Sequence, residues 1–226
     1  MRKKIAVLTG AGISAESGIK TFRDADGLWE NHRIEDVATP EAFELNPLLV
    51  LDFYNQRRRQ LLQCQPNSAH TALAMLEKDY DVTIITQNVD DLHERGGSTN
   101  IIHLHGQLLK SRSSKHEFPI YDQTTDIEIG DLCDKGTQLR PHIVWFGEAV
   151  PEIDRAIPVI QQCDILIVIG TSLMVYPAAG LVNYASYNAA KFLIDPHQLS
   201  LPCIPNLRFI NATATEGMAT LVTELL

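Results

Sequence analysis

The chain has 226 residues, of which 19 are basic and 28 acidic, so its formal net charge at pH 7 is -9. This length allows one large domain with a smaller lobe and a substantial core. The negative charge disfavours nucleic acid as a direct partner. No apolar run reaches the roughly eighteen residues that span a membrane, and the first run is too short for a signal peptide. We therefore expect a cytoplasmic protein with no nucleic-acid and no membrane partner.

Short apolar runs separated by longer polar intervals predict a parallel sheet, because most of the intervals are long enough for crossovers. The runs are 5–9, 82–86, 101–104, 165–169, 191–194 and 207–210. Apolar spacing also predicts helices at 70–78 and 220–226. The pattern is typical of an α/β fold with a Rossmann-like, doubly wound parallel sheet, in which ligands bind at the carboxyl ends of the strands.

Two stretches interrupt this alternation. Residues 24–69 contain the charged helical segment LLVLDFYNQRRRQLL, and residues 107–142 are polar and weakly periodic. We interpret both as insertions that form a smaller lobe over the sheet, one a helical module and the other a ribbon module. The Rossmann-like domain would then comprise residues 1–23, 70–106 and 143–226.

The first predicted strand runs directly into a glycine-rich turn. Gly10 and Gly12 permit close backbone approach, and Ser14 can cap a following helix whose N-terminal amides attract a pyrophosphate. The spacing of Gly10, Gly12 and Gly18 departs from the usual dinucleotide-binding pattern, so the turn alone is equally compatible with a simple strand-to-helix junction.

Polar residues also follow four of the later strands. They are Gln87, Asn88 and Asp90 after the second strand, His105 after the third, Gly170, Thr171 and Ser172 after the fourth, and Asp195 after the fifth. Each group alone has a structural explanation, as turn formers, a loop histidine or a helix cap. Their coincidence at one edge of the sheet, together with the glycine turn, indicates an enzyme site.

Five segments, in this order and spread over nearly the whole chain, resemble the sirtuins, a family of NAD-dependent protein deacylases. They are GAGISAESGIKTFR at 10–23, TQNVDDLHERGG at 86–97, HLHG at 103–106, RPHIVWFGE at 140–148 and IGTSLMVYPAAG at 169–180. The segment FYNQRRRQL at 53–61 is similar to short bacterial sirtuins of the branch that includes desuccinylases.

The resemblance implies that NAD binds between the two lobes. Its pyrophosphate would be held by Gly10, Ala11, Gly12 and Ser14, and its nicotinamide ribose would be covered by Phe22 and Arg23. The nicotinamide ring would be lined by Gln87, Asn88 and Asp90. The adenosine half would be held by Gly170, Thr171, Ser172, Asp195 and Ala214. Asp195 stands where the family usually has asparagine, and a carboxylate there favours NAD over NADP.

The resemblance also implies that His105 and Asn88 are catalytic. The acyl-lysine carbonyl oxygen would attack the nicotinamide ribose, nicotinamide would leave, and His105 would help to deprotonate a ribose hydroxyl. An imidazole of near-neutral pKa suits this role at cytoplasmic pH. The products would be free lysine, nicotinamide and 2′-O-acyl-ADP-ribose.

The implied partners are acyl-lysine proteins or peptides, bound in an extended conformation. The segment VWFGE would supply backbone hydrogen bonds to the substrate, as in β-strand addition. The residues that we expect to bind substrate in this way are Val144, Phe146, Gly147 and Glu148.

Tyr54 and Arg57 match the desuccinylase signature of the family and share a helix face. Arginine binds carboxylates bidentately, as succinyl- and malonyl-lysine require, while acetyl-lysine should still fit. Ala25, which is small, is consistent with a wider acyl pocket. Without the family context, Arg57, Arg58 and Arg59 would be interpreted as a solvated helix face.

The ribbon module departs from the family pattern. Most sirtuins hold it with four cysteines around zinc, whereas residues 107–142 contain only Cys133, and Ser113 stands where a first cysteine is expected. The other cysteines, Cys64, Cys163 and Cys203, are far apart, and the chain has no CxxC pair. We predict a module held by packing, with zinc absent and no metal site.

Three other functions remain compatible with the residues. The first is an NAD glycohydrolase or ADP-ribosyltransferase that uses the same pocket on another acceptor. The second is a catalytically silent NAD-binding module, which His105 beside Asn88 and Asp90 argues against. The third and weakest is a dehydrogenase that transfers hydride.

Overall fold

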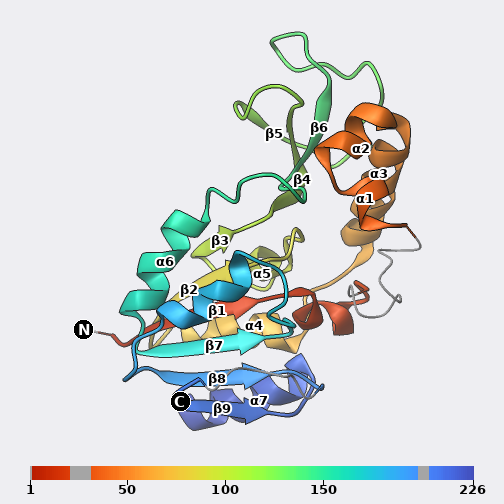
Figure 1. The fold of residues 1–226 in the computed structure, drawn as a ribbon. Helices are drawn as coiled ribbons and strands as arrows, with labels where there is room; N and C mark the ends of the chain where they lie inside the picture. The colour runs from red at the N-terminus through yellow and green to blue at the C-terminus, as the bar shows by residue number, and fades with distance from the viewer. Residues whose placement is uncertain (1, 21–31, 198–203) are drawn as a thin grey trace.

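The computed structural model describes residues 2–20, 32–197 and 204–226. Its main feature is a six-stranded sheet in which all neighbouring strands are parallel (Figure 1). The strands are β1 (Lys4–Thr9), β2 (Asp81–Thr86), β3 (Ile101–His103), β7 (Ile165–Ile169), β8 (Ala190–Ile194) and β9 (Leu207–Ile210). These are the six predicted runs, so the α/β class and the Rossmann-like sheet are confirmed.

The sheet is buried on both faces, as its continuous apolar strands require. Adjacent residues of β1, such as Ile5 and Ala6, belong to different core clusters because side chains alternate along a strand. The helices of the first face are α4 (Ser68–Leu76) and α7 (Ala214–Leu225), and those of the second are α6 (Ile153–Gln162) and the 3-10 helix η3 (Ala178–Tyr184). The fold is therefore doubly wound (Figure 1).

Two of these helices begin earlier than their apolar spacing predicts, because polar caps precede them. α4 starts at Ser68, after Asn67, whose side chain accepts a hydrogen bond from the Ala69 N–H. α7 starts at Ala214, after Thr213, whose hydroxyl accepts from the Glu216 N–H. Side-chain caps satisfy N–H groups that have no partner within the helix.

The order of the strands places β1 beside β7 at the centre of the sheet: β3-β2-β1-β7-β8-β9. From β1 the chain first builds outward to β2 and β3, and it then returns to β7 and builds outward on the other side. The crevice at the carboxyl ends of β1 and β7 is the topological switch point, where sheets of this kind bind ligands.

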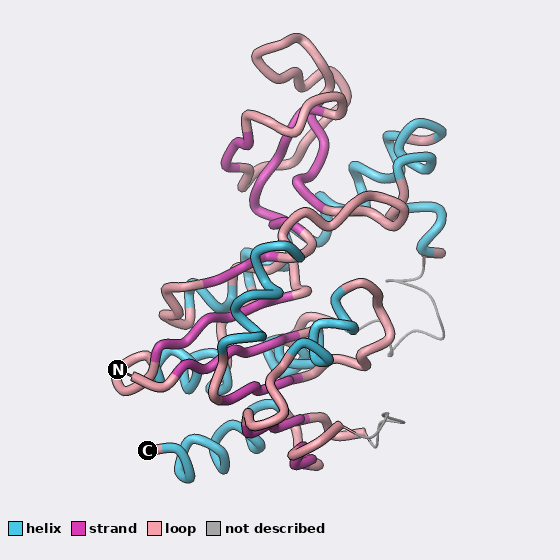
Figure 2. Tube along the Cα trace, turned by 60° about the vertical axis from the view of Figure 1, so that its left-hand side comes forward, coloured by secondary structure: helices cyan, strands magenta, loops and turns pink. Residues whose placement is uncertain are grey.

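The two predicted insertions fold into neighbouring structures beyond the carboxyl ends of these strands (Figures 1 and 2). In its described part, from residue 32 onward, the first forms the helices α1 to α3, and the second lies in a three-stranded antiparallel sheet of order β5-β4-β6. They are α1 (Ile34–Val37), α2 (Pro40–Leu45), α3 (Pro47–Gln63), β4 (Gly106–Ser113), β5 (Ile120–Asp122) and β6 (Leu139–Ile143). A single core cluster joins both parts, and it includes Phe53 of α3, Leu108 of β4 and Ile143 of β6. The residue boundaries between the two lobes stay a prediction.

Polar contacts from α3 hold the second insertion in place. The Asn55 side chain both donates to the Ile127 carbonyl and accepts from the Ile127 N–H, each over 2.9 Å. Around the remaining cysteine of this segment, the Thr137 hydroxyl lies 3.0 Å from the Cys133 sulfur and 2.5 Å from the Ser113 hydroxyl. Within the described residues, no group of three or more His, Cys, Asp or Glu side chains is placed to hold a metal. The absence of zinc stays a prediction.

Among the described residues, the helices are all too short or too polar to cross a membrane.

Candidate active site

The turns that follow β1 and β7 are in direct backbone contact. The N–H of Gly12 donates to the carbonyl of Gly170 over 2.8 Å. A Cβ atom on Gly12 would lie 2.6 Å from the Cα of Gly170, and one on Gly10 would lie 2.8 Å from the Gly170 oxygen. Gly170 has a φ of +60°, which favours glycine. The glycine turn was predicted to allow close backbone approach, and in the structure the backbone that approaches it is that of the Gly170 loop.

The prediction that Ser14 caps a helix is wrong. The turn continues into two 3-10 turns, η1 (Ala11–Ile13) and η2 (Ala15–Ser17), and the Ser14 side chain makes no capping hydrogen bond to either. Its hydroxyl instead donates to the Asp90 carboxylate over 3.0 Å and accepts from the Asn88 side-chain amide over 3.1 Å. Ser14 therefore makes hydrogen bonds to residues distant in the chain in place of a local helix-capping bond.

Ser14, Asn88 and Asp90 form a buried network just beyond β1 and β2. Asp90 is only 6% exposed, and burial raises the pKa of its carboxyl group to about 6. The Leu92 N–H and the Ser14 hydroxyl donate to this carboxylate and partly oppose the rise. The structure thus joins three of the predicted site residues through direct hydrogen bonds.

His105 lies at the end of β3, directly before β4, with its Nδ1 atom 3.0 Å from the carbonyl oxygen of Gln87. A carbonyl only accepts, so Nδ1 carries the ring proton and Nε2 keeps the lone pair. Burial lowers the pKa of His105, and the bond to Gln87 only partly offsets that effect. The ring is consequently neutral at pH 7, with a nitrogen that can accept a proton.

The residues after β7 are connected to those after β2. The Gln87 side-chain amide donates to the Thr171 hydroxyl over 3.0 Å, and the Leu173 N–H donates to the same oxygen. Thr171 is buried, and Ser172 beside it is half-buried. The residues predicted after the second, third and fourth strands of the sheet are therefore brought together at the switch point.

Asp195 and Ala214 lie farther along the same edge of the sheet. Asp195 follows β8 directly, is 2% exposed, and accepts a hydrogen bond from the His197 N–H over 2.9 Å. Its side chain also forms an ion pair with the His197 ring when that ring is protonated. Ala214 is the first residue of α7 and is buried. Phe22, Arg23 and Ala25, the remaining predicted residues near the cofactor, lie outside the described residues.

The three consecutive arginines of α3 have three different environments. Arg57 is half-buried, with its guanidinium 4.0 Å above the ring centroid of Phe53. Arg58 is fully buried and donates to the Leu108 carbonyl, and burial lowers its pKa to about 10. Arg59 is exposed and pairs with Asp126. The alternative of one solvated helix face is therefore wrong for Arg58.

Tyr54, the other predicted acyl-pocket residue, is 1% exposed and accepts a hydrogen bond from the indole Nε1 of Trp145 over 2.9 Å. Sequence reasoning did not select Trp145, although it lies within the VWFGE segment. Its indole is the only donor-only ring side chain in that segment, a property that could have marked it as a partner for a buried hydroxyl.

The backbone donors of the predicted peptide-binding segment are largely engaged within the protein. The N–H groups of Val144, Phe146 and Glu148 donate to the carbonyls of His105, Ala38 and Trp145. The Glu148 carboxylate, in turn, accepts from the Trp145 N–H and from Arg140. Among the described residues, the N–H of Gly147 and the carbonyl groups of this segment other than that of Trp145 are thus left to pair with an extended peptide.

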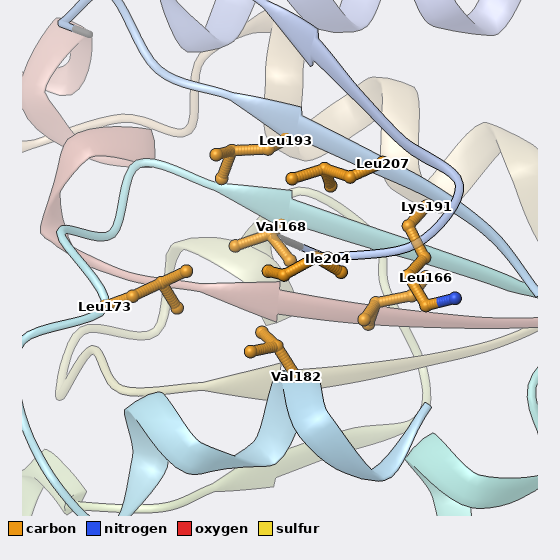
Figure 3. Close-up of a pocket in the computed structure, with 8 residues that line it drawn as sticks. All are labelled: Leu166, Val168, Leu173, Val182, Lys191, Leu193, Ile204 and Leu207. Carbon is orange, nitrogen blue, oxygen red and sulfur yellow. The ribbon is translucent and has the colours of Figure 1, made fainter. Parts of the chain in front are cut away.

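A small pocket lies away from these residues, between β7, β8 and η3 (Figure 3). Apart from Lys191 its lining is apolar, with side chains such as Val182 and Leu193. The Lys191 ammonium group donates to the carbonyls of Ser186 and Ala189. We assign this pocket to packing because its lining is otherwise apolar and the Lys191 ammonium group is already bonded to these two carbonyls.

Comparison with known proteins places the chain in a family. The Sir2 family matches residues 10–177 of the chain. The chain belongs to the Sir2 family. An NAD-dependent protein deacylase of Helicobacter pylori is 55% identical over 224 residues, which cover 99% of this chain and 98% of that protein.

Solved Sir2 structures share the whole fold. A variant of a Sir2 homologue in complex with ADP-ribose is 42% identical, with a TM-score of 0.91 and coverage of 99% of this chain and 92% of that chain. A Sir2 homologue in complex with NAD is also 42% identical, with a TM-score of 0.88 and coverage of 99% and 90%. The resemblance to the sirtuins is therefore confirmed at the level of both sequence and fold.

Proposed function

We propose that the protein is an NAD-dependent protein-lysine deacylase that transfers the acyl group of an acyl-lysine to ADP-ribose. The observation that carries this proposal is His105, a half-buried neutral imidazole with its basic nitrogen unprotonated, at the strand ends of a Sir2 chain. Such a nitrogen can take a proton from a hydroxyl group at pH 7. The name of the Helicobacter relative supports the same activity.

The residues at the switch point fit NAD. Gly10, Gly12 and Gly170 let the turns after β1 and β7 pack directly against each other, and this close packing shapes the edge of the sheet where we propose that a pyrophosphate binds. NAD would supply an electrophilic ribose carbon with nicotinamide as its leaving group. We propose that Ala11 and Ser14 complete the pyrophosphate site, while Thr171, Ser172, Asp195 and Ala214 bind the adenosine half. Phe22 and Arg23, which we assigned to the nicotinamide ribose, lie outside the described residues.

The nicotinamide end would be held by Gln87, Asn88 and Asp90. The Asn88 amide and the Asp90 carboxylate are fixed by Ser14, so they need little reorganisation when a polar ring binds. Asn88 would thereby assist His105 in catalysis. The high pKa of Asp90 allows its carboxyl group to act as donor or acceptor near pH 6.

The acylated protein or peptide would bind beside Val144, Phe146, Gly147 and Glu148, paired to their free backbone groups. The protein has a net charge of -9, which attracts basic, lysine-rich segments and repels nucleic acid. Three described cysteines, Cys64, Cys133 and Cys163, are free, which supports a reducing location such as the cytoplasm.

We further propose that Tyr54 and Arg57 select acyl groups with a terminal carboxylate, namely succinyl and malonyl. Their places on α3, one turn apart, allow both to reach the same end of an acyl chain. The test compares the Arg57→Met variant with an Arg59→Met control on succinyl-, malonyl- and acetyl-lysine peptides with NAD, by mass spectrometry.

Loss of a charge-assisted hydrogen bond costs about 1.5–3 kcal/mol, so Arg57→Met should reduce the succinyl-to-acetyl ratio of kcat/KM by roughly 10- to 100-fold. Arg59→Met should leave this ratio unchanged, because Arg59 faces Asp126 and solvent. Equal ratios in the two variants would remove Arg57 from acyl selection. A wild type that removes no acyl group would refute the deacylase itself.

A further inference from the structure

Two histidines to which no role has been assigned are buried side by side. His70 of α4 and His93 of the short helix α5 (Leu92–Arg95) are both 0% exposed, and their ring centroids are 4.9 Å apart. The turn after α5 packs tightly on the pair, since a Cβ atom on Gly96 would lie only 2.8 Å from the Cβ of His70. Water therefore has no access to either ring while α5 stays in place.

The hydrogen bonds of His93 show which of its nitrogens carries the proton. The Thr9 hydroxyl donates to the Thr86 hydroxyl over 2.8 Å, so it accepts from His93 Nε2, which is 3.1 Å away. Nδ1 of His93 then keeps its lone pair, and within the described part of the chain this buried atom has no hydrogen-bond partner. Protonation of His93 would thus create a buried donor that has no acceptor.

His70 is neutral for a similar reason. Its Nδ1 atom accepts from the main-chain N–H of Asn67 over 3.3 Å, in the capping box that begins α4. The Asn67 Oδ1 atom is 3.1 Å from the same nitrogen but already accepts from the Ala69 N–H. We therefore place the ring proton on Nε2, which is buried and unpartnered among the described residues. A positive charge on either ring would be unpaired.

The surroundings of the pair also oppose a positive charge. Burial lowers the pKa of His70 to about 4 and that of His93 well below its ordinary value of 6.5, and the charges of Arg95 on His70 and of His103 on His93 add to this effect. The Cys64 thiol at the end of α3 stays neutral, because burial raises its pKa. The carboxylates next to His93 in the chain are engaged with other groups: Asp90 with Ser14, Asp91 with Arg95 and Glu94 with His103.

The helix that carries His93 connects three parts of the molecule. At its start, the Leu92 N–H donates to the Asp90 carboxylate of the candidate active site over 3.1 Å. At its end, the Arg95 guanidinium donates to the carbonyls of Leu61 and Cys64, where α3 ends. Between them, His93 bonds to Thr9 of β1. A displacement of α5 would therefore be felt at the site and at the smaller lobe.

We propose that the His70–His93 pair is an acid-sensitive fastening: as the pH falls from about 7 toward 5, protonation of His93 requires α5 to separate from α4 and β1, and Asp90 then loses its Leu92 donor. This inference goes beyond the proposed deacylase function and does not depend on it. The pair acts on the fold at the edge of the site and takes no part in the reaction.

The first test compares the wild type with His93→Gln. A glutamine amide can occupy the place of Nε2 and keep the donor to Thr9, and it does not titrate. Because the folded pKa of His93 lies below 6.5, the neutral ring adds stability above that pH, and the stability is lost as the pH falls below it. In urea unfolding, the unfolding constant of the wild type should rise roughly 30-fold more than that of the variant between pH 7.5 and 5.0.

His116→Gln is the matched control, because it makes the same change at an exposed histidine of the ribbon module. This variant should follow the wild type. The same pH dependence in the wild type and in His93→Gln would overturn the proposal. So would a loss of acid sensitivity in His116→Gln as large as that in His93→Gln.

Hydrogen exchange tests whether α5 itself opens. The N–H groups of Gly96 and Ser98 donate to the carbonyls of Leu92 and His93, so their exchange reports on this helix. After correction for the intrinsic rate, their protection should fall about 10-fold more in the wild type than in His93→Gln between pH 7.5 and 5.5. An equal fall in both proteins would overturn the local opening that we propose.

If His93→Gln does not fold, the wild type alone provides the test, through the imidazole nitrogen signals of the ¹⁵N-labelled protein. We expect His93 to remain neutral, with its proton on Nε2, for as long as the amides of α5 stay protected. A His93 ring that becomes protonated near its ordinary pKa of 6.5 while these amides keep their protection would overturn the proposal.

Discussion

Burial acts in opposite directions on the charges of His105 and Asp90. It lowers the pKa of the imidazole and raises that of the carboxyl group to about 6, because both groups avoid charge when water is withdrawn. The site therefore contains a neutral base and a carboxyl group that titrates near pH 6. Groups with such shifted pKa values are more common at functional sites than elsewhere in proteins.

The raised pKa of Asp90 predicts a cost to stability at neutral pH. A carboxyl group binds its proton more tightly in the folded state when its folded pKa lies above its ordinary value of 3.8. The cost of ionising it is therefore absent at low pH, grows as the pH rises through the interval from 3.8 to about 6, and is complete above that interval.

Asp90→Asn should remove this cost. We expect the variant to be more stable than wild type by about 1–3 kcal/mol at pH 8, with little or no gain at pH 4, and to lose deacylase activity. Urea unfolding at both pH values measures the difference. Asp79→Asn, a change at an exposed carboxylate, is the matched control. A loss of stability at pH 8, or a gain that is equal at both pH values, would contradict this account of Asp90.

Sequence patterns were least informative about the surroundings and partners of individual side chains. Helix spacing placed Tyr54 and Arg57 one turn apart on a helix, as α3 has them, but it could not show that Arg58 is buried against Leu108. Ser14 has the residue type of a cap, yet its partners Asn88 and Asp90 are more than seventy residues away. Side-chain partners that are distant in the chain depend on the assembled fold.

At the scale of elements, the strands were predictable because a strand buried on both faces needs a continuous apolar run. The helix starts were not, since the first turn of α7 carries the polar sequence Ala-Thr-Glu-Gly and depends on the Thr213 cap. The small antiparallel sheet was also missed, because its strands are short and mix polar with apolar residues.

The contact between the loops after β1 and β7 leads to a prediction about glycine. In Gly12→Ala the new methyl group would meet the backbone of Gly170 at 2.6 Å, and backbone cannot rotate away as a side chain can. We expect a loss of about 2–4 kcal/mol in the free energy of unfolding, together with much weaker NAD binding by calorimetry.

Gly136→Ala is the control for this prediction. Gly136 has a φ of +71° and no atoms that a Cβ would meet within 4 Å, so this change should cost only about 1 kcal/mol and leave NAD affinity intact. If Gly12→Ala were as mild as Gly136→Ala, the two loops would not be packed as described.

At the scale of the whole molecule, one core cluster joins the three helices and the antiparallel sheet of the smaller lobe. The paired hydrogen bonds between Asn55 and the Ile127 backbone connect its two parts directly. Breaking these two buried hydrogen bonds is costly, because the Asn55 amide and the Ile127 backbone would both be left without hydrogen-bond partners.

The protein should therefore be insensitive to chelators. We expect elemental analysis of the purified protein to find far less than one zinc per chain. Its thermal midpoint and deacylase rate should be unchanged after incubation with EDTA. Stoichiometric zinc, or a midpoint that falls with chelator and recovers with added zinc, would show that the ribbon module holds a metal.

The account as a whole depends on the transfer of an acyl group from lysine to ADP-ribose at the edge of the sheet where His105 lies. The most direct measurement follows nicotinamide release from NAD with and without a succinyl-lysine peptide, together with the mass of the ADP-ribose product. We predict that release requires the peptide and matches, mole for mole, both the free lysine peptide and an O-succinyl-ADP-ribose. Nicotinamide released equally without peptide, or NADH in its place, would contradict the account.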